Sequence, residues 1–463
     1  MGAVGCGMAG EHTQETTELL STLIRNACVN DGTPDSGNET RNSDLLRAFL
    51  EGPGVEIEAY TPRPGRDSLI ARIEGSDPDA PTLCFMGHTD VVPVTAEGWT
   101  EDPFGGLVLD AEGTDGRPMK EVWGRGAIDM LNLTSSMAVA FKQLARSNWK
   151  PKGTLLYFGV GDEEAGGVWG AKWMVDHHWD ALVGRNGRLD YVLTEMGGWL
   201  HSGGRKVGIC IGEKGIAWRR LRVKGTPGHG SMPYGTDNAV VKAAEVVARL
   251  ARFKPAAKLD ELWAARITTS TMPEHLKAAL LDPARIEAAL GELTPSSAKH
   301  LHACTHTTIS PNVVHGGVKT NVIPDVVEID VDIRTLPGVT GGDVDGYLRE
   351  ALGELADQVE ISAIFNDEAS SSSTRTPLWE ILTARTRVAY PQADLLPELI
   401  VGATDSRFFR GKGTVAYGTG LFAPSVSFEQ FAGRFHGHDE RIDVESLGLC
   451  TDYWLGIAQD LLD

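Results

Sequence analysis

The sequence is poor in the features that mark secreted, membrane-spanning or nucleic-acid-binding proteins. Its six cysteines are scattered over 463 residues without a Cys-x-x-Cys pair, which argues against a disulfide framework or a thiolate zinc site and favours a reducing, cytoplasmic location. No apolar run reaches the ~18–20 residues that a membrane-spanning helix needs, and residues 1–11 lack the pattern of a signal peptide and suggest an irregular start. The net charge of −20 predicts no nucleic-acid or membrane partner.

What is present is ordinary for a globular protein, with 41% hydrophobic and 23% charged residues. The length suggests two or three domains. The chain has neither a Gly-x-Ser-x-Gly nucleophile elbow nor a phosphate-binding P-loop, so the usual signals of a serine hydrolase and of a nucleotide-binding enzyme are both missing.

Short apolar runs alternate with helical patterns between residues 80 and 200. Residues 82–86, 154–160 and 191–193 are continuous apolar runs of the kind found in strands covered on both faces. Amphipathic patterns at 134–146 and 170–177 predict helices between them. The alternation predicts an α/β domain with a mostly parallel sheet.

The pattern changes near Lys214. Alternating runs and helical stretches then follow over residues 218–223, 238–250, 326–333, 344–355 and 359–365, in a β-α-β-β-α-β-like order. This order predicts a ferredoxin-like α+β domain inserted into the first. Residues 367–376 are the best linker candidate. We therefore expect a catalytic domain at 1–213 and 367–463 and an inserted domain at 214–366; residues 255–300 suggest no function.

Acidic and histidine side chains follow each predicted strand of the first domain. His88 and Asp90 follow the first strand, Glu163 and Glu164 follow the second, and Glu195 follows the third. Asp129 precedes a predicted helix. Since ligands bind outside the carboxyl ends of parallel strands, we expect these groups to converge in one crevice.

Several carboxylates gathered in one crevice would repel each other unless they were protonated or shared a cation. Histidine together with carboxylate suits zinc. The number of candidate ligands exceeds what one ion needs, which suggests two metals that share a bridging carboxylate. Any one of these acids taken alone is more simply explained as a solvated loop residue.

Seven motifs then carry a resemblance to a known family. They are MGHTDVVPV, WGRGAIDM, GDEEAGG, LTEMGG, GTPGHGSMP, KTNVIPD and FHGHDER, spread over residues 86–441. In this order they resemble the zinc aminoacylase, glutamate carboxypeptidase and succinyl-diaminopimelate desuccinylase family of metallopeptidases. The resemblance implies a zinc-peptidase catalytic domain interrupted by a lid and dimerisation domain.

The resemblance also implies a role for each residue of the crevice. His88 and Glu195 would bind one Zn²⁺, Glu164 and His436 the other, and Asp129 would bridge the two, with Co²⁺ or Mn²⁺ as possible substitutes. Asp90 would accept the second ring N–H of His88 and so fix its tautomer. Glu163 would act as general base toward a water molecule and then as general acid toward the leaving nitrogen.

The resemblance also bears on the last metal ligand and on one peptide bond. His438 competes with His436 for the last ligand position, and the resemblance implies His436, because the family's pattern places this ligand four residues before the closing glutamate, here Glu440. The family also tends to hold the bond after the bridging aspartate in the cis form, so we predict a cis Asp129–Met130 peptide. Leu131-Asn132 after this bond departs from the lysine or glycine common in the family, which affects local contacts only.

Three residues of the inserted domain resemble substrate contacts. His229 would cross to the partner subunit's active site and stabilise an oxyanion, which implies a homodimer. Asn321 would contact substrate. Arg334 would hold a substrate carboxylate through two hydrogen bonds, or would instead form a surface salt bridge.

The sequence thus predicts a dinuclear zinc amidohydrolase for a peptide or N-acyl amino acid with a free carboxylate. Carboxypeptidase or dipeptidase action is favoured over N-acyl-amino-acid deacylation. A catalytically silent amino-acid-binding relative and a mononuclear enzyme are the rivals. Separately, His300, His302, Cys304 and His306 alternate, which predicts a polar strand and leaves a further metal site open.

Overall fold

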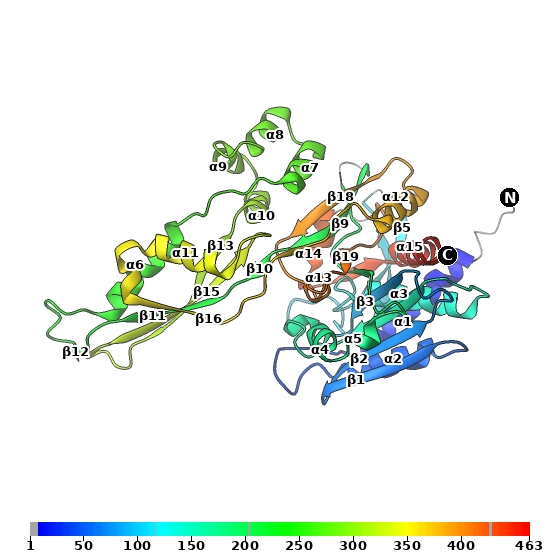
Figure 1. Ribbon diagram of the computed structural model, residues 1–463, viewed down its shortest axis with the longest axis horizontal. Coiled ribbons are helices and arrows are strands. Elements are labelled where there is room, and N and C mark those ends of the chain that lie inside the picture. The colour runs from blue at the N-terminus through cyan, green and yellow to red at the C-terminus, as the bar shows by residue number, and fades with distance from the viewer. Residues whose placement is uncertain (1–7, 115, 202–203, 426–427) are drawn as a thin grey trace. The chain divides into compact units, whose positions relative to one another are not determined.

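The computed structural model describes residues 8–114, 116–201, 204–425 and 428–463. Of the irregular start predicted for residues 1–11, residues 1–7 lie outside these ranges, and residues 8–11 belong to a helix instead. The chain divides into two compact units (Figure 1). The first comprises Met1–Ile211, Ser372–Glu398 and Thr404–Asp463, and the second comprises Gly212–Ser371 and Leu399–Ala403. The sequence predicted 214–366 for the inserted domain, whereas the second unit runs from Gly212 to Ser371 and also includes Leu399–Ala403, which the prediction assigned to the first domain. The role of the second unit as a lid remains a prediction.

A mixed sheet forms the centre of the first unit. Its strands lie in the order β1 (Glu56–Arg63), β2 (Arg66–Ile73), β6 (Thr154–Val160), β3 (Thr82–His88), β7 (Tyr191–Thr194), β19 (Val415–Gly418) and β9 (Lys206–Glu213), and β8 (Leu200–His201) and β18 (Asp394–Ile400) also pair with β9. The four strands from β6 to β19 run parallel and their neighbours are antiparallel. The α/β fold with a mainly parallel centre is therefore confirmed.

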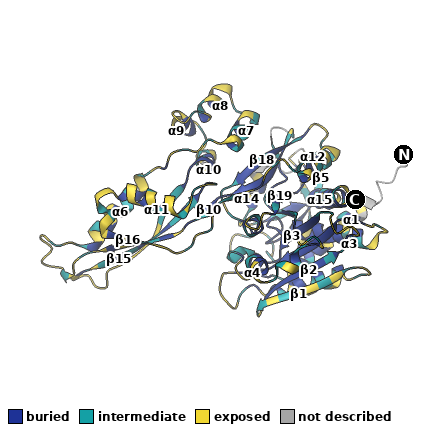
Figure 2. Cartoon of the chain, in the orientation of Figure 1, coloured by how far each residue is buried: buried dark blue, intermediate teal, exposed yellow. Residues whose placement is uncertain are grey.

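Helices cover both faces of this sheet because its central strands are apolar on both sides. Every residue of β3 and β6 is buried (Figure 2). On β3, Phe85 packs against Trp454 of one helical layer, whereas Cys84 and Met86 belong to a core shared with Met174 on the other. The first layer contains α1 (Met8–Arg25), α2 (Thr40–Leu50), α3 (Leu131–Arg146), α12 (Pro377–Ala389) and α15 (Val444–Leu462); the second contains α4 (Ala171–His177), α5 (Trp179–Leu182) and α13 (Ser406–Arg410).

Smaller elements complete the first unit. A three-stranded sheet has the order β20 (Arg441–Asp443), β5 (Pro118–Trp123) and β4 (Leu107–Glu112). A 3-10 helix, η1 (Glu163–Ala165), follows β6, and α14 (Phe428–Arg434) precedes β20. Among the helices in the described ranges, none combines the length and the apolar character that crossing a bilayer requires.

The second unit contains an antiparallel sheet covered by two helices. Strands β16 (Val359–Ala363), β11 (Arg219–Lys224) and β15 (Val326–Thr335) are neighbours, and β13 (Thr308–Gly316) and β10 (Gly215–Ile216) also pair with β15. Alternate residues of β15 are buried against α6 (Ala239–Arg252) and α11 (Gly341–Leu352). The β-α-β-β-α-β order expected from the sequence is present.

The remaining elements of this unit lie outside that sheet. They are the paired strands β12 (Gly228–His229) and β14 (Val322–Ile323), the 3-10 helix η2 (Gly353–Gln358), and β17 (Ser370–Ser371), which pairs with the end of β9. Four short helices form an insertion between α6 and β13: α7 (Glu261–Thr269), α8 (Glu274–Leu280), α9 (Ile286–Leu290) and α10 (Pro295–Thr305). The strand predicted for residues 300–306 is therefore wrong. Thr294 begins a helix there by capping it at Ser297 N–H, with Pro295 in its first turn.

Candidate metal centre

The carboxyl ends of the parallel strands bring the predicted acidic and histidine side chains together. His88 is the last residue of β3, Glu163 and Glu164 lie in η1 directly after β6, and Glu195 follows β7. Asp129 lies just before α3, and its peptide bond to Met130 is cis, as predicted. His436 joins them from the loop after α14 and has a positive φ of 54°. The convergence expected from strand order is present.

The carboxylate of Asp129 lies between two imidazoles. Its Oδ1 is 3.2 Å from His88 Nε2, and its Oδ2 is 3.0 Å from His436 Nε2. Each imidazole also faces a glutamate, because His88 Nε2 is 3.9 Å from Glu195 Oε2 and His436 Nε2 is 3.5 Å from Glu164 Oε2. One carboxylate therefore has a histidine–glutamate pair on each side.

Glu163 and Glu164 point to different parts of this cluster. One candidate ligand group contains His88, Asp129 and Glu164, and another contains His88, Glu163 and Glu195; within each group the ligand atoms lie within 4.8 Å of one another. The Oε1 atom of Glu164 is buried and has no hydrogen-bond partner among the described residues. An orphaned carboxylate oxygen beside further carboxylates and imidazoles fits a site for divalent cations.

Burial and neighbouring charges shift the pKa values of these groups. Burial, followed by the charge of Glu195, raises the pKa of Glu163 well above its usual value, and burial and Asp129 do the same for the pKa of Glu195. Hydrogen bonds to Asp129 and Glu164 raise the pKa of His436 to about 10. Burial alone would raise the pKa of Asp129, but the bonds from the two histidines outweigh it and lower this pKa.

Asp90 supports the cluster differently from what the sequence predicts. The Nδ1–H of His88 donates to the backbone carbonyl of Asp90 at 2.9 Å, whereas the nearest carboxylate oxygen of Asp90 is 3.7 Å away. That carboxylate instead accepts hydrogen bonds from Asn30 Nδ2 (2.8 Å) and from the backbone N–H of Glu164 (3.1 Å). The main chain of Asp90 therefore orients His88, and its side chain fixes the start of η1.

A buried ion pair that the sequence analysis did not assign holds the loops of Asp129 and His436. Glu440 Oε1 accepts from the backbone N–H groups of Ile128 (2.9 Å) and Asp129 (3.3 Å), and its Oε2 lies 2.6 Å from Arg125 Nη1. Arg125 Nη2 donates to the carbonyl of His436 at 3.2 Å. In the sequence analysis Glu440 served only to locate the last ligand within the FHGHDER motif. Its contacts could not be predicted, because they are made with residues more than 300 positions away in the sequence.

A second buried pair sets the position of η1. Arg66 Nη1 is 2.7 Å from Glu39 Oε1, and Arg66 Nε is 3.4 Å from Asp162 Oδ1, immediately before Glu163. Asp405, just before α13, is also buried, and its two carboxylate oxygens have no hydrogen-bond partner among the described residues. Burial raises the pKa of Asp405 to about 7. No local pattern around these residues distinguishes them from solvated loop acids.

The two competing histidines of the last loop lie in different surroundings. His436 faces Asp129 and Glu164, as described above. The ring of His438 packs edge-on against Trp99, with ring centroids 6.4 Å apart, and Gly98 leaves room for that ring. The geometry favours His436 over His438 as the candidate ligand.

The three predicted substrate contacts all lie in the second unit. His229 is exposed on β12, and Gly230 N–H donates to the carbonyl of Asn321 at 2.9 Å, so His229 and Asn321 belong to the same small ribbon. Arg334 Nε lies 2.8 Å from Asp332 Oδ1. The salt bridge left open for Arg334 by the sequence is present, and the substrate roles of the three residues stay predictions.

Comparison with known proteins identifies the family of this chain. The sequence pattern of peptidase family M20/M25/M40 matches residues 84–460, which include every residue of the cluster described above. The chain belongs to this family. It is therefore a hydrolytic enzyme, and the family is metal-dependent.

Curated members of the M20 family resemble the chain over different lengths. A succinyl-diaminopimelate desuccinylase of Rhodospirillum centenum is 33% identical over 215 residues, 45% of this chain and 50% of that protein. The match thus spans half of that relative. A succinyl-diaminopimelate desuccinylase of Cereibacter sphaeroides is 25% identical over 461 residues, 96% of this chain and 97% of that protein.

Solved M20 structures share the fold. An M20 metallo-carboxypeptidase of Sulfolobus solfataricus superposes with a TM-score of 0.68 at 17% identity and covers 96% of this chain and 98% of its own. The Bacillus subtilis YXEP protein, a dinuclear metal binding peptidase, superposes with a TM-score of 0.60 at 16% identity over 97% of this chain and 99% of its own. At these identities the likeness establishes the fold alone.

Proposed function

We propose that this M20 hydrolase uses two divalent metal ions, with zinc as the expected metal, to cleave the amide bond of a peptide or N-acyl amino acid that bears a free carboxylate. The observation that carries the proposal is the position of Asp129, whose two carboxylate oxygens face His88 and His436 separately. A carboxylate that offers one oxygen to each of two cations is the arrangement of a dinuclear site.

The proposed ligands are His88 and Glu195 on one side, Glu164 and His436 on the other, and Asp129 between them. When bound, the cations would acidify a water molecule and polarise the substrate carbonyl. Glu163 would accept a proton from that water and return it to the leaving nitrogen.

Two substrate classes fit the same chemistry. Carboxypeptidase or dipeptidase action is the first, and the solved carboxypeptidase of similar fold supports it. Removal of an acyl group from an N-acyl amino acid is the second, supported by the similarity to succinyl-diaminopimelate desuccinylases. A panel of dipeptides and N-acyl amino acids, assayed for release of the free amine, separates the two.

We also propose that the second unit forms a homodimer and that His229, Asn321 and Arg334 contact the substrate, with His229 acting in the partner's site. Exposed valines on adjacent elements support an interface there. Val240 and Val241 on α6 are 45% and 67% exposed, and Val313 and Val314 on β13 are 39% and 54% exposed. Apolar side chains grouped on one surface are typical of interaction sites.

Glu163→Gln tests the mechanism most directly. The variant should lose at least ~100-fold in turnover, because it lacks the proton-transfer group, while its bound metal, measured by elemental analysis, stays equal to that of the wild type. Glu51→Gln, a change at an exposed glutamate after α2, is the matched control and should leave both quantities unchanged.

Three results would contradict the proposal. Activity that survives removal of metal by a chelator would exclude the metal mechanism. A single equivalent of metal bound at this cluster, in place of two, would indicate a mononuclear enzyme. Binding of amino-acid-like ligands without any amine release would indicate a catalytically silent relative.

A further inference from the structure

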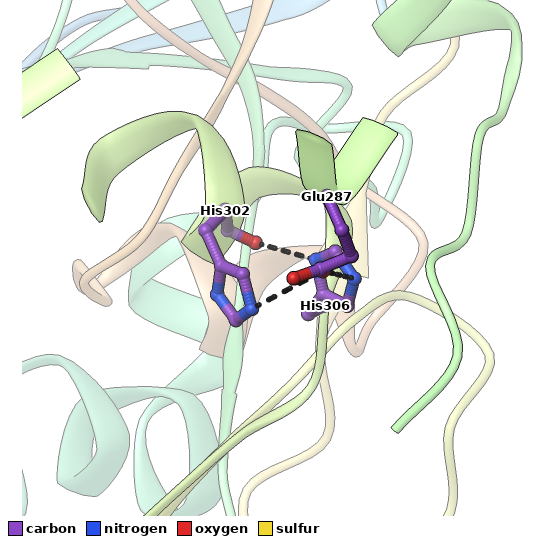
Figure 3. A group of neighbouring side chains, drawn as sticks. All are labelled: Glu287, His302 and His306. Carbon is purple, nitrogen blue, oxygen red and sulfur yellow. Dashed lines mark hydrogen bonds and ion pairs between the residues drawn. The ribbon is translucent and has the colours of Figure 1, made fainter. Parts of the chain in front are cut away.

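The helical insertion of the second unit contains a second group of side chains with metal-ligand chemistry, separate from the candidate centre of the first unit. Glu287 lies on α9, His302 lies on α10, and His306 lies directly after α10 (Figure 3). One ligand atom from each of the three lies within 4.8 Å of the others. The proposed hydrolysis assigns no role to these residues.

The helix brings the two imidazoles together. His302 and His306 are four residues apart at the end of α10, so they lie one above the other. Their rings are parallel, with centroids 4.0 Å apart and an interplanar angle of 4°. Both Nε2 atoms face the same oxygen, Glu287 Oε1, at 3.9 Å from His302 and 3.2 Å from His306.

Hydrogen bonding favours one tautomer of His306. Its Nδ1 is 3.1 Å from the backbone carbonyl of His302 and 2.9 Å from Thr305 Oγ1, whose own hydroxyl donates to the carbonyl of Leu301. A hydrogen on Nδ1 serves both acceptors and leaves the Nε2 lone pair of the neutral ring facing a carboxylate oxygen, a repulsive contact that a cation between the two atoms would relieve. His88 has the same arrangement in the candidate metal centre, where Nδ1 donates to the carbonyl of Asp90 and Nε2 faces Asp129.

Protonating both rings would be unfavourable here. Two positive rings stacked at this distance would repel each other, and Lys254 already places a positive charge 3.0 Å from Glu287 Oε2. A single cation bound by both Nε2 atoms and by Glu287 Oε1 would satisfy all three groups at once. It would also leave Glu287 Oε2 in place for Lys254.

We propose that Glu287, His302 and His306 form a further metal site that binds a divalent transition-metal ion, with Zn²⁺ as the expected ion. Two imidazoles and one carboxylate form a three-ligand set that suits zinc and leaves a fourth position for water. The side chains of Glu287 and His302 are 47% and 33% exposed, so solvent reaches the site.

The proposed role is to join α9 to the end of α10. The insertion has a small core of its own around Trp263, Leu280 and Leu290, and its longest helix has 11 residues. Short helices with a small core gain little stability from apolar burial, and a metal cross-link is one way to compensate. We therefore expect the ion to protect this segment from local unfolding.

The test compares zinc stoichiometry and local protection in the full-length protein. Wild-type protein equilibrated with excess Zn²⁺ and then freed of unbound ion should hold one equivalent more than His302→Ala. Zinc should also slow amide hydrogen exchange of residues 286–306 at least tenfold in the wild type and not in the variant. Neither readout depends on hydrolytic activity or on how many ions the first unit binds.

Two further variants make the outcome decisive. Glu287→Gln keeps the shape of the side chain and removes its charge, so it should also lose one equivalent even if His302→Ala folds poorly. His300→Ala is the matched control on the same helix, since His300 Nε2 faces Arg266 and Cys304 instead, and it should retain the wild-type stoichiometry. Equal zinc content in wild type, His302→Ala and Glu287→Gln, or exchange in residues 286–306 that zinc does not change, would overturn the proposal.

Discussion

Replacing Glu440 by glutamine tests whether a residue outside the proposed ligand set holds that set in place. Glu440 is fully buried and combines an ion pair to Arg125 with two backbone hydrogen bonds, to Ile128 and Asp129. The carbonyl oxygen of the introduced glutamine could still accept from the two backbone N–H groups. Its amide N–H₂ would then face the Arg125 guanidinium, donor against donor, and the buried arginine charge would lose its anionic partner.

The expected cost follows from that burial. Only 4% of the Arg125 side chain is exposed, and removing one partner of a buried ion pair costs about 3–5 kcal/mol. For a unit of this size such a loss lowers Tm by roughly 6–10 °C. Since Arg125 also donates to the carbonyl of His436, we expect Zn²⁺ affinity to fall ~10–100-fold although every proposed ligand remains.

Calorimetry of the metal-free protein measures the first effect, and competition with a chelator of known affinity measures the second. Asp345→Asn is the matched control, because Asp345 pairs with the buried Arg219 in the second unit. Arg219 is as buried as Arg125, with 4% of its side chain exposed, so this variant should also lose stability, but it should leave zinc affinity unchanged because Asp345 belongs to the second unit. If Glu440→Gln binds zinc like the wild type, Glu440 does not position Asp129, and if its Tm is also unchanged the buried-charge argument fails.

Two further predictions concern charge and assembly. The metal-free protein should lose stability as pH rises from about 6.5 to 10, because His436, with a folded pKa raised to about 10 by Asp129 and Glu164, stabilises the fold only while it is protonated. The Tm difference between wild type and His436→Gln in chelator should shrink over this range, and a constant difference would contradict the assignment. Val241→Glu, on the exposed face of α6, should shift the mass measured by light scattering from that of a dimer to that of a monomer. The control Val388→Glu, at a 74% exposed position of α12, should leave the mass unchanged. A wild-type protein that is already a monomer would exclude the proposed interface.

The sequence predicted the central strands and the crossover helices because their patterns are local. The continuous apolar runs of β3 and β6 are readable without a structure, since strands buried on both faces contain few polar residues. The sequence also predicted β15, because one face of this strand is buried and the other is not, which gives alternating apolar and polar residues. Strand order then placed His88, Glu164 and Glu195 at one edge of the sheet.

The failures have physical causes as well. Residues 300–306 alternate in polarity, and this two-residue period predicted a strand. The cap at Thr294 and Pro295 instead begins a helix that reaches Thr305, so the helix-starting signal was stronger than the short alternating pattern. The sequence pattern also assigned the carboxylate of Asp90 to His88. In the structure the backbone carbonyl of Asp90 accepts from His88 instead. Every residue has a backbone carbonyl, so the type of residue cannot predict such a contact.

The sequence by itself determined which chemical groups the chain can bring to a metal and roughly where the two units divide, because strand patterns and residue types are properties of short segments. Only the tertiary structure decided which oxygen faces which imidazole, that Arg125 and Glu440 join loops more than 300 residues apart, and that Glu287 meets two histidines at the end of another helix. Those contacts depend on distances between segments that the chain brings together only on folding.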